Sequence, residues 1–387
     1  MNVRIKTFLA LSLFFCASCA QKAETEAISI NPDTINAEYR LASYPIDVTS
    51  NCPWSVKIQD SDAAWVSIQT KGSGDEKINV RILKNPYKDA RSATLEFITG
   101  TGVSASLKIN QAGDPNAEEK VEMNVRLGTY NLRMEQADEA AENKWAVRKD
   151  RLLVSIRENA FGIFGVQEVN TTMQSWLKTN FGSEYEIFFF SPYSQSGTGD
   201  KAQGILFKAK EFDLISKGFF WASNTPDIMT KNDTGDQGNF SRGGNWVILK
   251  HKETGIELFF MNTHGCLNSQ PNKDNAIYYK QIEQKYNTRS LPSFFVGDMN
   301  ARPTYDAIAT FKLHWKDSYD VVASDKKSGP ENTYNGFTAT QGKYRLDYVF
   351  CRGDKYKVNA YCVNNKLYNG QFASDHFPVY ADVTINK

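Results

Sequence analysis

The sequence predicts two domains of different class, an all-β sandwich followed by an α/β sandwich. Three observations support this prediction. Short strand-like runs fill residues 27–113, strand-like and helix-like runs alternate over residues 121–387, and a polar segment with one proline, residues 114–120, separates them. A chain of 387 residues, 41% of them hydrophobic, is long enough to form two separate cores.

The first nineteen residues have the composition of an export signal. Arg4 and Lys6 precede an apolar stretch that is too short to span a bilayer. The stretch ends in Cys16-Ala17-Ser18-Cys19, which resembles the processing box of bacterial lipoproteins with Cys19 as the lipidated residue. We therefore expect an exported protein, anchored by lipid in the bacterial cell envelope at the outer membrane, on its periplasmic or its outer face. An ordinary cleaved signal peptide is the alternative.

The first domain is predicted to be a small sandwich, because apolar and polar residues alternate in short runs between turn-forming residues. The clearest runs cover residues 55–58, 77–82, 93–98 and 106–109. The domain resembles the BACON domain, an immunoglobulin-like module of secreted and surface proteins, through Asn51-Cys52-Pro53-Trp54, Trp65-Val66-Ser67-Ile68, Arg91-Ser92-Ala93-Thr94 and Asn110-Gln111-Ala112-Gly113. This resemblance implies glycan binding. Trp54 and Trp65 would be its stacking platforms, although tryptophan in a small sandwich is more often part of the core.

The second domain carries polar side chains at the ends of strand-like runs. Helices are expected at residues 145–159, 172–180 and 274–286, from apolar residues spaced among charges. Five strand-like stretches carry Asn, Glu, Asn/His, Asp/Asn and Asp/His, at 125–131, 163–168, 258–264, 293–300 and 374–379. Residues two apart on extended backbone point the same way, so Asp298 and Asn300 are expected to project together. We expect the five ends to converge on one site.

Six motifs of this domain occur in the order found in the endonuclease/exonuclease/phosphatase superfamily, which it resembles over residues 121–387. They are Gly128-Thr129-Tyr130-Asn131, Gly165-Val166-Gln167-Glu168-Val169, Asn262-Thr263-His264, Gly297-Asp298-Met299-Asn300-Ala301, Arg345-Leu346-Asp347-Tyr348-Val349-Phe350 and Ser374-Asp375-His376-Phe377-Pro378-Val379. The resemblance implies a four-layer α/β sandwich of the deoxyribonuclease-I-like type and a phosphoester hydrolase.

Hydrolysis of a phosphoester needs charge neutralisation and an aligned water, and the motifs offer residues for both. Glu168 supplies a hard carboxylate for Mg²⁺, with Mn²⁺ and Ca²⁺ as alternatives, and the resemblance adds Asn131 and Asp375 near that metal. Asp347 is predicted to orient His376 beside the phosphate, while the resemblance gives Asp298 and Asn300 the attacking water. His264 is predicted to be a second phosphate ligand or acid, and Arg242 and Asn262 to bind substrate. The remaining histidines, His251 and His314, have no motif around them and are predicted to be structural.

The net charge and the cysteine spacing argue against two kinds of site, one for nonspecific nucleic-acid binding and one for zinc. The formal net charge of +1 is near neutral, which argues against tight nonspecific binding of nucleic acid. Cys52, Cys266, Cys351 and Cys362 lack metal-ligand spacing, so no zinc site is predicted. Cys351 and Cys362 flank a turn between two strand-like runs, so either a cross-strand disulfide or free thiols fit.

The leading hypothesis is therefore an exported, metal-dependent phosphodiesterase or phosphatase. Its substrate would be a phosphoester of a small polyol, sugar, lipid headgroup or nucleotide. Relatives often carry an Asp–His pair after the position of His264 and an acid at that of Gln203; this chain has Gly265-Cys266-Leu267-Asn268 and glutamine there, so the chemistry transfers better than the specificity. A secreted endonuclease is one alternative. A glycan-binding surface protein with an inert hydrolase-like domain is the other.

Overall fold

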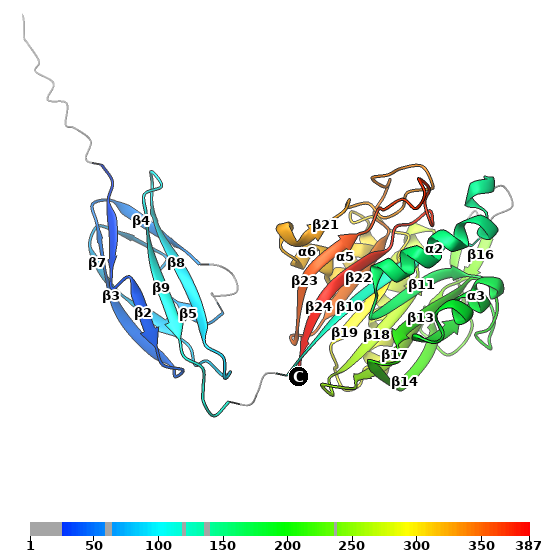
Figure 1. Ribbon diagram of the computed structural model, residues 1–387, viewed down its shortest axis with the longest axis horizontal. Coiled ribbons are helices and arrows are strands. Elements are labelled where there is room, and N and C mark those ends of the chain that lie inside the picture. The colour runs from blue at the N-terminus through cyan, green and yellow to red at the C-terminus, as the bar shows by residue number, and fades with distance from the viewer. Residues whose placement is uncertain (1–24, 59–63, 118–120, 135–139, 236–237) are drawn as a thin grey trace, which may run out of the picture. The chain divides into compact units, whose positions relative to one another are not determined.

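The chain divides into two units, Met1–Lys120 and Val121–Lys387, in the computed structural model of the protein (Figure 1). The structure describes residues 25–58, 64–117, 121–134, 140–235 and 238–387. The predicted leader and its lipidation residue, Cys19, lie outside these ranges, as does the end of the predicted linker. Within them, no helix combines the length and the apolar character that a membrane crossing requires.

The first unit is a sandwich of two sheets, with strand orders β1-β3-β7-β5 and β2-β9-β8-β4-β6. Its core contains Trp54 and Trp65, which are 3% and 8% exposed, so both tryptophans belong to the core and offer no open stacking face. The strands are β1 (Ile28–Asn31), β2 (Thr34–Ala37), β3 (Ala42–Ser50), β4 (Pro53–Lys57), β5 (Val66–Ser67), β6 (Lys71–Ser73), β7 (Glu76–Ile82), β8 (Arg91–Thr99) and β9 (Ser104–Gln111).

The second unit contains two large sheets packed face to face. A core that includes Leu127 and Ile163 of one sheet and Phe260 and Val296 of the other lies between them. One sheet has seven strands, β12 (Tyr185–Phe190), β13 (Ala202–Lys208), β11 (Ile163–Val169), β10 (Glu122–Asn131), β24 (Val379–Asn386), β23 (Tyr356–Val363) and β21 (Lys327–Ser328). The other has six, β14 (Phe212–Trp221), β17 (Gly243–His251), β18 (Glu257–His264), β19 (Ser293–Asp298), β22 (Asp347–Arg352) and β20 (Lys316–Asp317). A separate two-stranded antiparallel sheet consists of β15 (Lys231–Gly235) and β16 (Gly238–Ser241).

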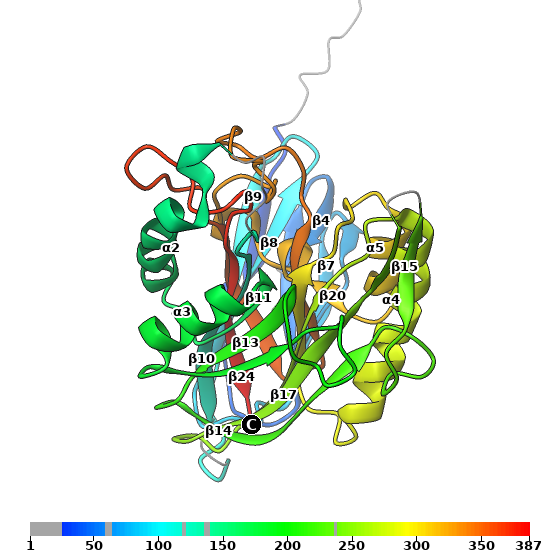
Figure 2. The same cartoon turned by 90° about the vertical axis from the view of Figure 1, so that its right-hand side faces the viewer.

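Helices cover the outer face of each large sheet. The seven-stranded sheet packs against α2 (Trp145–Asn159) and α3 (Thr171–Phe181), and the six-stranded sheet against α4 (Ser269–Tyr286) and α5 (Asp306–Lys312). Figure 2 shows the two helix pairs on opposite sides of the sheets. The short helices are η1 (Ala141–Asn143), α6 (Ser318–Val321) and η2 (Ser324–Lys326). The domain is therefore the four-layer α/β sandwich that the motifs implied, and α2, α3 and α4 contain the three predicted helices.

Strand register brings the predicted residues together at one edge. β10 and β11 run parallel and pair Asn131 with Gln167, next to Glu168. β18 and β19 run parallel and pair His264 with Asp298, while β22 runs antiparallel and pairs its first residue, Asp347, with Asp298. The carboxyl ends of parallel strands meet at the same edge of a sheet. The start of an antiparallel neighbour lies at the same edge, so strand ends distant in sequence become adjacent.

At the end of the chain, one prediction is wrong in detail and one open alternative is decided. Asp375 and His376 precede a strand, β24, instead of ending one, and loop residues 333–335 hold them through backbone hydrogen bonds. For Cys351 and Cys362 a cross-strand disulfide and free thiols were both open, and their strands belong to different sheets. Both are free thiols.

Candidate active site

A cavity of about 630 Å³ lies where the strand ends of the second unit meet. Seven of the ten residues predicted for the site of this domain line it: Glu168, Arg242, His264, Asp298, Asn300, Asp375 and His376. The other three, Asn131, Asn262 and Asp347, are fully buried behind the lining. The topology thus gathers residues from both sheets and from the loop before β24 at one place.

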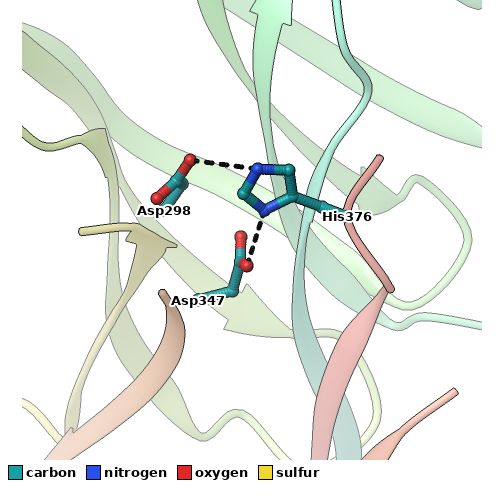
Figure 3. Close-up of side chains that lie close together, drawn as sticks. All are labelled: Asp298, Asp347 and His376. Carbon is teal, nitrogen blue, oxygen red and sulfur yellow. Dashed lines mark hydrogen bonds and ion pairs between the residues drawn. The ribbon is translucent and has the colours of Figure 1, made fainter. Parts of the chain in front are cut away.

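His376 lies between two carboxylates, as Figure 3 shows. Its Nδ1 is 2.8 Å from Oδ2 of Asp347, and its Nε2 is 3.6 Å from Oδ2 of Asp298. Thr333 donates its hydroxyl proton to the same Asp347 oxygen, at 2.5 Å, while its Oγ accepts the backbone N–H groups of residues 346 and 347. The Tyr334 ring meets the imidazole edge to face, with centroids 5.1 Å apart. The imidazole is therefore fixed from three sides.

Burial and the neighbouring charges together raise the pKa values of both His376 and Asp298. Burial opposes a charged imidazole, but Asp347 and Asp298 outweigh burial and raise the pKa of His376 to about 10. For Asp298 burial acts in the other direction: it disfavours the charged carboxylate and raises the pKa to about 7. A carboxylate with a pKa near neutrality is suited to accept a proton from water, and an imidazolium is suited to bind a phosphoryl oxygen.

Asp298 and Asn300 both line the cavity, but for a reason different from the predicted one. Asn300 has a φ of 48°, so the backbone after Asp298 is not extended. The segment instead turns, and the backbone N–H of Asn300 donates to Oδ1 of Asp298 at 2.8 Å. A turn of this kind is a common use of Asp. Here it also presents both side chains to the cavity.

A second pair of carboxylates, Glu168 and Asp375, lines the same cavity. Burial raises the pKa of Asp375, and the charge of Glu168 contributes to that rise. Glu168 adopts a φ of 59°, which is uncommon outside glycine and asparagine and is often found at functional sites. A buried and a half-buried carboxylate that repel each other fit a hard divalent cation, which would offset their charge. Arg133 lies 3.6 Å from Asp375 and offsets part of it.

A further group of possible ligand atoms consists of those of Asp298, Asp347 and His376, which all lie within 4.8 Å of one another. The hydrogen bond between His376 and Asp347 already accounts for part of this closeness. A cation at this place would have to displace that bond. The donor chemistry therefore fits a metal better at Glu168 and Asp375.

Two further residues of the cavity lining, His264 and Arg242, add a neutral and a positive group. His264 is 3.6 Å from Asp298, and burial, together with the charges of Arg242, His376 and Lys201, lowers its pKa well below the usual value. Arg242 reaches the cavity while its Nε donates to Asp233 at 3.0 Å. A neutral histidine donor beside a fixed guanidinium suits the oxygens of a phosphate.

The structure changes the roles of two predicted residues. Asn262 does not reach the cavity: its Oδ1 accepts from Gln167 at 2.8 Å, and its Nδ2 donates to backbone carbonyls of β11 and β13. The prediction that it binds substrate is wrong, because pairing between the two sheets uses both ends of its amide. Asn131 turns its Nδ2 toward Asp298 and Glu168, at 3.0 and 3.3 Å, so its amide nitrogen orients these carboxylates. His251 and His314 lie outside the cavity lining, bonded to Thr254 and Glu283.

Several residues that shape the site lie outside every motif recognised in the sequence. Thr333 and Tyr334 lie in an irregular loop without a motif, and Asp233, which holds Arg242, lies inside a short hairpin strand. Lys201 and Tyr193 line the cavity from the segment between β12 and β13. Their contacts depend on which loops meet. The one hint that the sequence offers for such residues is a polar segment next to a predicted strand.

Comparison with known proteins agrees with this architecture. The model of the Endonuclease/Exonuclease/phosphatase family matches residues 128–376, and that of the BACON family, an N-terminal domain to which binding has been ascribed, matches residues 54–112. No curated protein matches the chain.

Solved structures show the same fold. An endonuclease/exonuclease/phosphatase family protein of Bacteroides thetaiotaomicron is 24% identical, with a TM-score of 0.62 over 69% of this chain and 97% of that one. A mannosyl-6-phosphatase of the same species is 25% identical, with a TM-score of 0.59 over 67% and 99%. TDP2 of Danio rerio, complexed with a single-stranded DNA product, is 16% identical, with a TM-score of 0.51 over 67% and 98%. Since the family model covers well over half of the chain, the protein belongs to the endonuclease/exonuclease/phosphatase family.

Proposed function

We propose that the protein is a metal-dependent hydrolase of small phosphoesters. The observation that carries the proposal is the position of His376, held between Asp347 and Asp298 in the same cavity as the carboxylates of Glu168 and Asp375. An imidazolium, a carboxylate of near-neutral pKa and a pair of acids together match the needs of phosphoester cleavage. A domain that had lost its activity would be expected to have lost some of these groups.

Each group has a part in the reaction. Asp298, whose pKa burial raises to about 7, takes a proton from a water whose oxygen attacks phosphorus, and Asn300 helps to place that water. As the new P–O bond forms, the ester P–O bond breaks, and the leaving oxygen takes up a proton from solvent and departs as an alcohol. His376 and Arg242 bind the phosphoryl oxygens, where negative charge develops. Neutral His264 donates a hydrogen bond to the same group.

Glu168 and Asp375 are the residues that would hold the metal, which we propose to be Mg²⁺, with Mn²⁺ or Ca²⁺ as alternatives. A bound divalent cation supplies charge neutralisation at the phosphoryl group. Asn131 orients Glu168 through its amide nitrogen, and Arg133 balances the charge of Asp375.

The substrate class follows from the shape and charge of the site. A cavity of about 630 Å³ is in the size range of small-molecule sites, so it can enclose a phosphate together with a sugar-sized leaving group. The near-neutral chain lacks the basic excess that tight polynucleotide binding needs. The mannosyl-6-phosphatase among the similar structures supports a sugar phosphate.

The proposal is tested by assaying purified protein, with Mg²⁺, Mn²⁺, Ca²⁺ or chelator, on p-nitrophenyl phosphate, bis-p-nitrophenyl phosphate, hexose phosphates and duplex DNA. We expect turnover of small phosphoesters that chelator abolishes and a divalent ion restores, and we expect the His376→Ala variant to lose it. Cleavage of DNA without turnover of small esters would favour the secreted endonuclease. No turnover with any ion would favour the inert alternative.

We also propose that the protein is exported and attached to the envelope by lipid on Cys19. The basic and apolar order of residues 1–19 and the small residues before the cysteine support this. Expression in a Gram-negative host with radiolabelled palmitate tests it. Wild-type protein should take up label in the membrane fraction and Cys19→Ala should not. Unlabelled wild-type protein free in the periplasm would contradict the anchor.

A further inference from the structure

Lys201 differs from the other positively charged groups of the cavity in its neighbours. Arg242 is paired with Asp233, Arg133 lies near Asp375, and His376 lies between two carboxylates. Lys201 also lines the cavity, yet no carboxylate in the described part of the chain lies within ion-pair distance of its ammonium group. This positive charge therefore has no acidic protein partner there, which leaves it available to a ligand.

Two aromatic rings hold Lys201 in the cavity. Its Nζ lies 5.1 Å from the centroid of Tyr193 and 5.3 Å from that of Phe240, and both rings line the cavity as well. A cation over aromatic faces is stabilised by their negative potential but keeps its hydrogen-bond donors. Lys201 has a φ of 52°, so the backbone turns here, just before β13. The lysine is therefore held without being neutralised.

The charge of Lys201 acts on a histidine of the proposed reaction centre. Its charge is among those that lower the pKa of His264, after burial, Arg242 and His376, so the ammonium group acts on the same centre. His376, Arg242 and the metal ligands already provide for one phosphoryl group. A cavity of about 630 Å³ has room for more than that group. On the wall formed by Lys201, Tyr193 and Phe240, a leaving group would meet two rings and one positive charge.

We propose that Lys201 binds a second anionic group on the leaving group, so that the enzyme selects phosphoesters that carry another phosphate or a carboxylate. Tyr193 and Phe240 would pack against the carbon skeleton that bears this group. The inference rests on the proposed phosphoester hydrolase and adds its substrate class. A lysine is suited to this role, because its three rotatable N–H donors can bind either a tetrahedral phosphate or a planar carboxylate.

The test compares three substrates with the same 6-phosphate ester: glucose 6-phosphate, glucose 1,6-bisphosphate and 6-phosphogluconate. Wild-type protein should have a higher kcat/KM on one or both of the substrates with a second anion, and which of them is preferred identifies a phosphate or a carboxylate. Lys201→Met should raise KM for the preferred substrate about tenfold or more, with kcat little changed. KM for glucose 6-phosphate should change by less than threefold. Lys201→Arg should keep most of the preference.

Lys217→Met is the matched control. Lys217 also lies over a ring, 5.0 Å from the centroid of Phe188, but does not line the cavity. This variant should behave as wild type on all three substrates. Equal loss of kcat on all three substrates in Lys201→Met would overturn the inference, because Lys201 would then act on the reacting phosphoryl group. Unchanged kinetics, or a wild-type preference for glucose 6-phosphate, would overturn it too.

The proposed function and this inference fail in different ways. Protein that hydrolyses no phosphoester, including p-nitrophenyl phosphate, contradicts the proposed function and the inference with it. Protein that hydrolyses p-nitrophenyl phosphate but none of the three sugar phosphates contradicts the inference alone.

Discussion

Replacing Asp347 with asparagine removes one of the two negative charges that hold His376 and leaves the shape of the site unchanged. The Thr333 hydroxyl donates to Oδ2 of Asp347, so the asparagine carbonyl is expected to take this position and still accept from His376. The new NH₂ group then replaces Oδ1, which has no hydrogen-bond partner in the described structure. The substitution therefore tests the charge of Asp347 more than its geometry.

The expected loss follows from the strength of a buried, charge-assisted hydrogen bond. Such a bond contributes about 1.5–3 kcal/mol, and each 1.4 kcal/mol is roughly a tenfold change in rate, so kcat should fall by about 10- to 100-fold. KM should change much less, since Asp347 does not line the cavity. The buried NH₂ group without an acceptor should cost about 1–3 kcal/mol of unfolding free energy, visible as a melting temperature lower by several degrees.

The assay measures kcat and KM on p-nitrophenyl phosphate at saturating Mg²⁺, together with thermal melting. It includes Asp347→Asn, His376→Ala and the double variant. If Asp347 acts through His376, the double variant should be no slower than His376→Ala alone. A kcat within threefold of wild type, or fully additive losses in the double variant, would refute the coupling of Asp347 to His376.

Three further predictions concern other parts of the domain. Glu168→Gln should lower kcat at least about 100-fold and raise the Mg²⁺ concentration needed for half-maximal activity; an unchanged Mg²⁺ titration would show that Glu168 holds no metal. Asn262→Ala should lower the unfolding free energy by about 1–3 kcal/mol in urea titrations and leave KM unchanged, because its amide bonds only to protein. Burial alone raises the pKa of Glu283, but hydrogen bonds from His314 and Asn287 and the charge of Arg352 bring it below 4.5. Its ionised form therefore stabilises the fold above pH 4.5, and this contribution is lost as the pH falls through the lowered pKa. Glu283→Gln should cost about 3 kcal/mol at pH 7 and progressively less at acid pH, and a pH-independent difference between the two melting curves would contradict this.

Local sequence was sufficient to predict the order of the domains and ten site residues, seven of which line the cavity. Glu168, His264 and Asp298 are each the last or next-to-last residue of an apolar strand, so their place at the end of a sheet depends only on that strand. The helices that contain 145–159, 172–180 and 274–286 follow from apolar periodicity in the same way. Neighbours in the chain specify these features.

The tertiary structure alone decided which atoms each side chain meets. Asn131 contacts Asp298 across 167 positions of sequence, and Asn262 contacts Gln167 across 95, so neither partner could be read from the strand that carries the asparagine. The same applies to Lys201, whose rings come from two separate segments. A strand end specifies that a polar group reaches the edge of a sheet. Whether that group faces the cavity, a carboxylate or another strand depends on how distant segments pack around it.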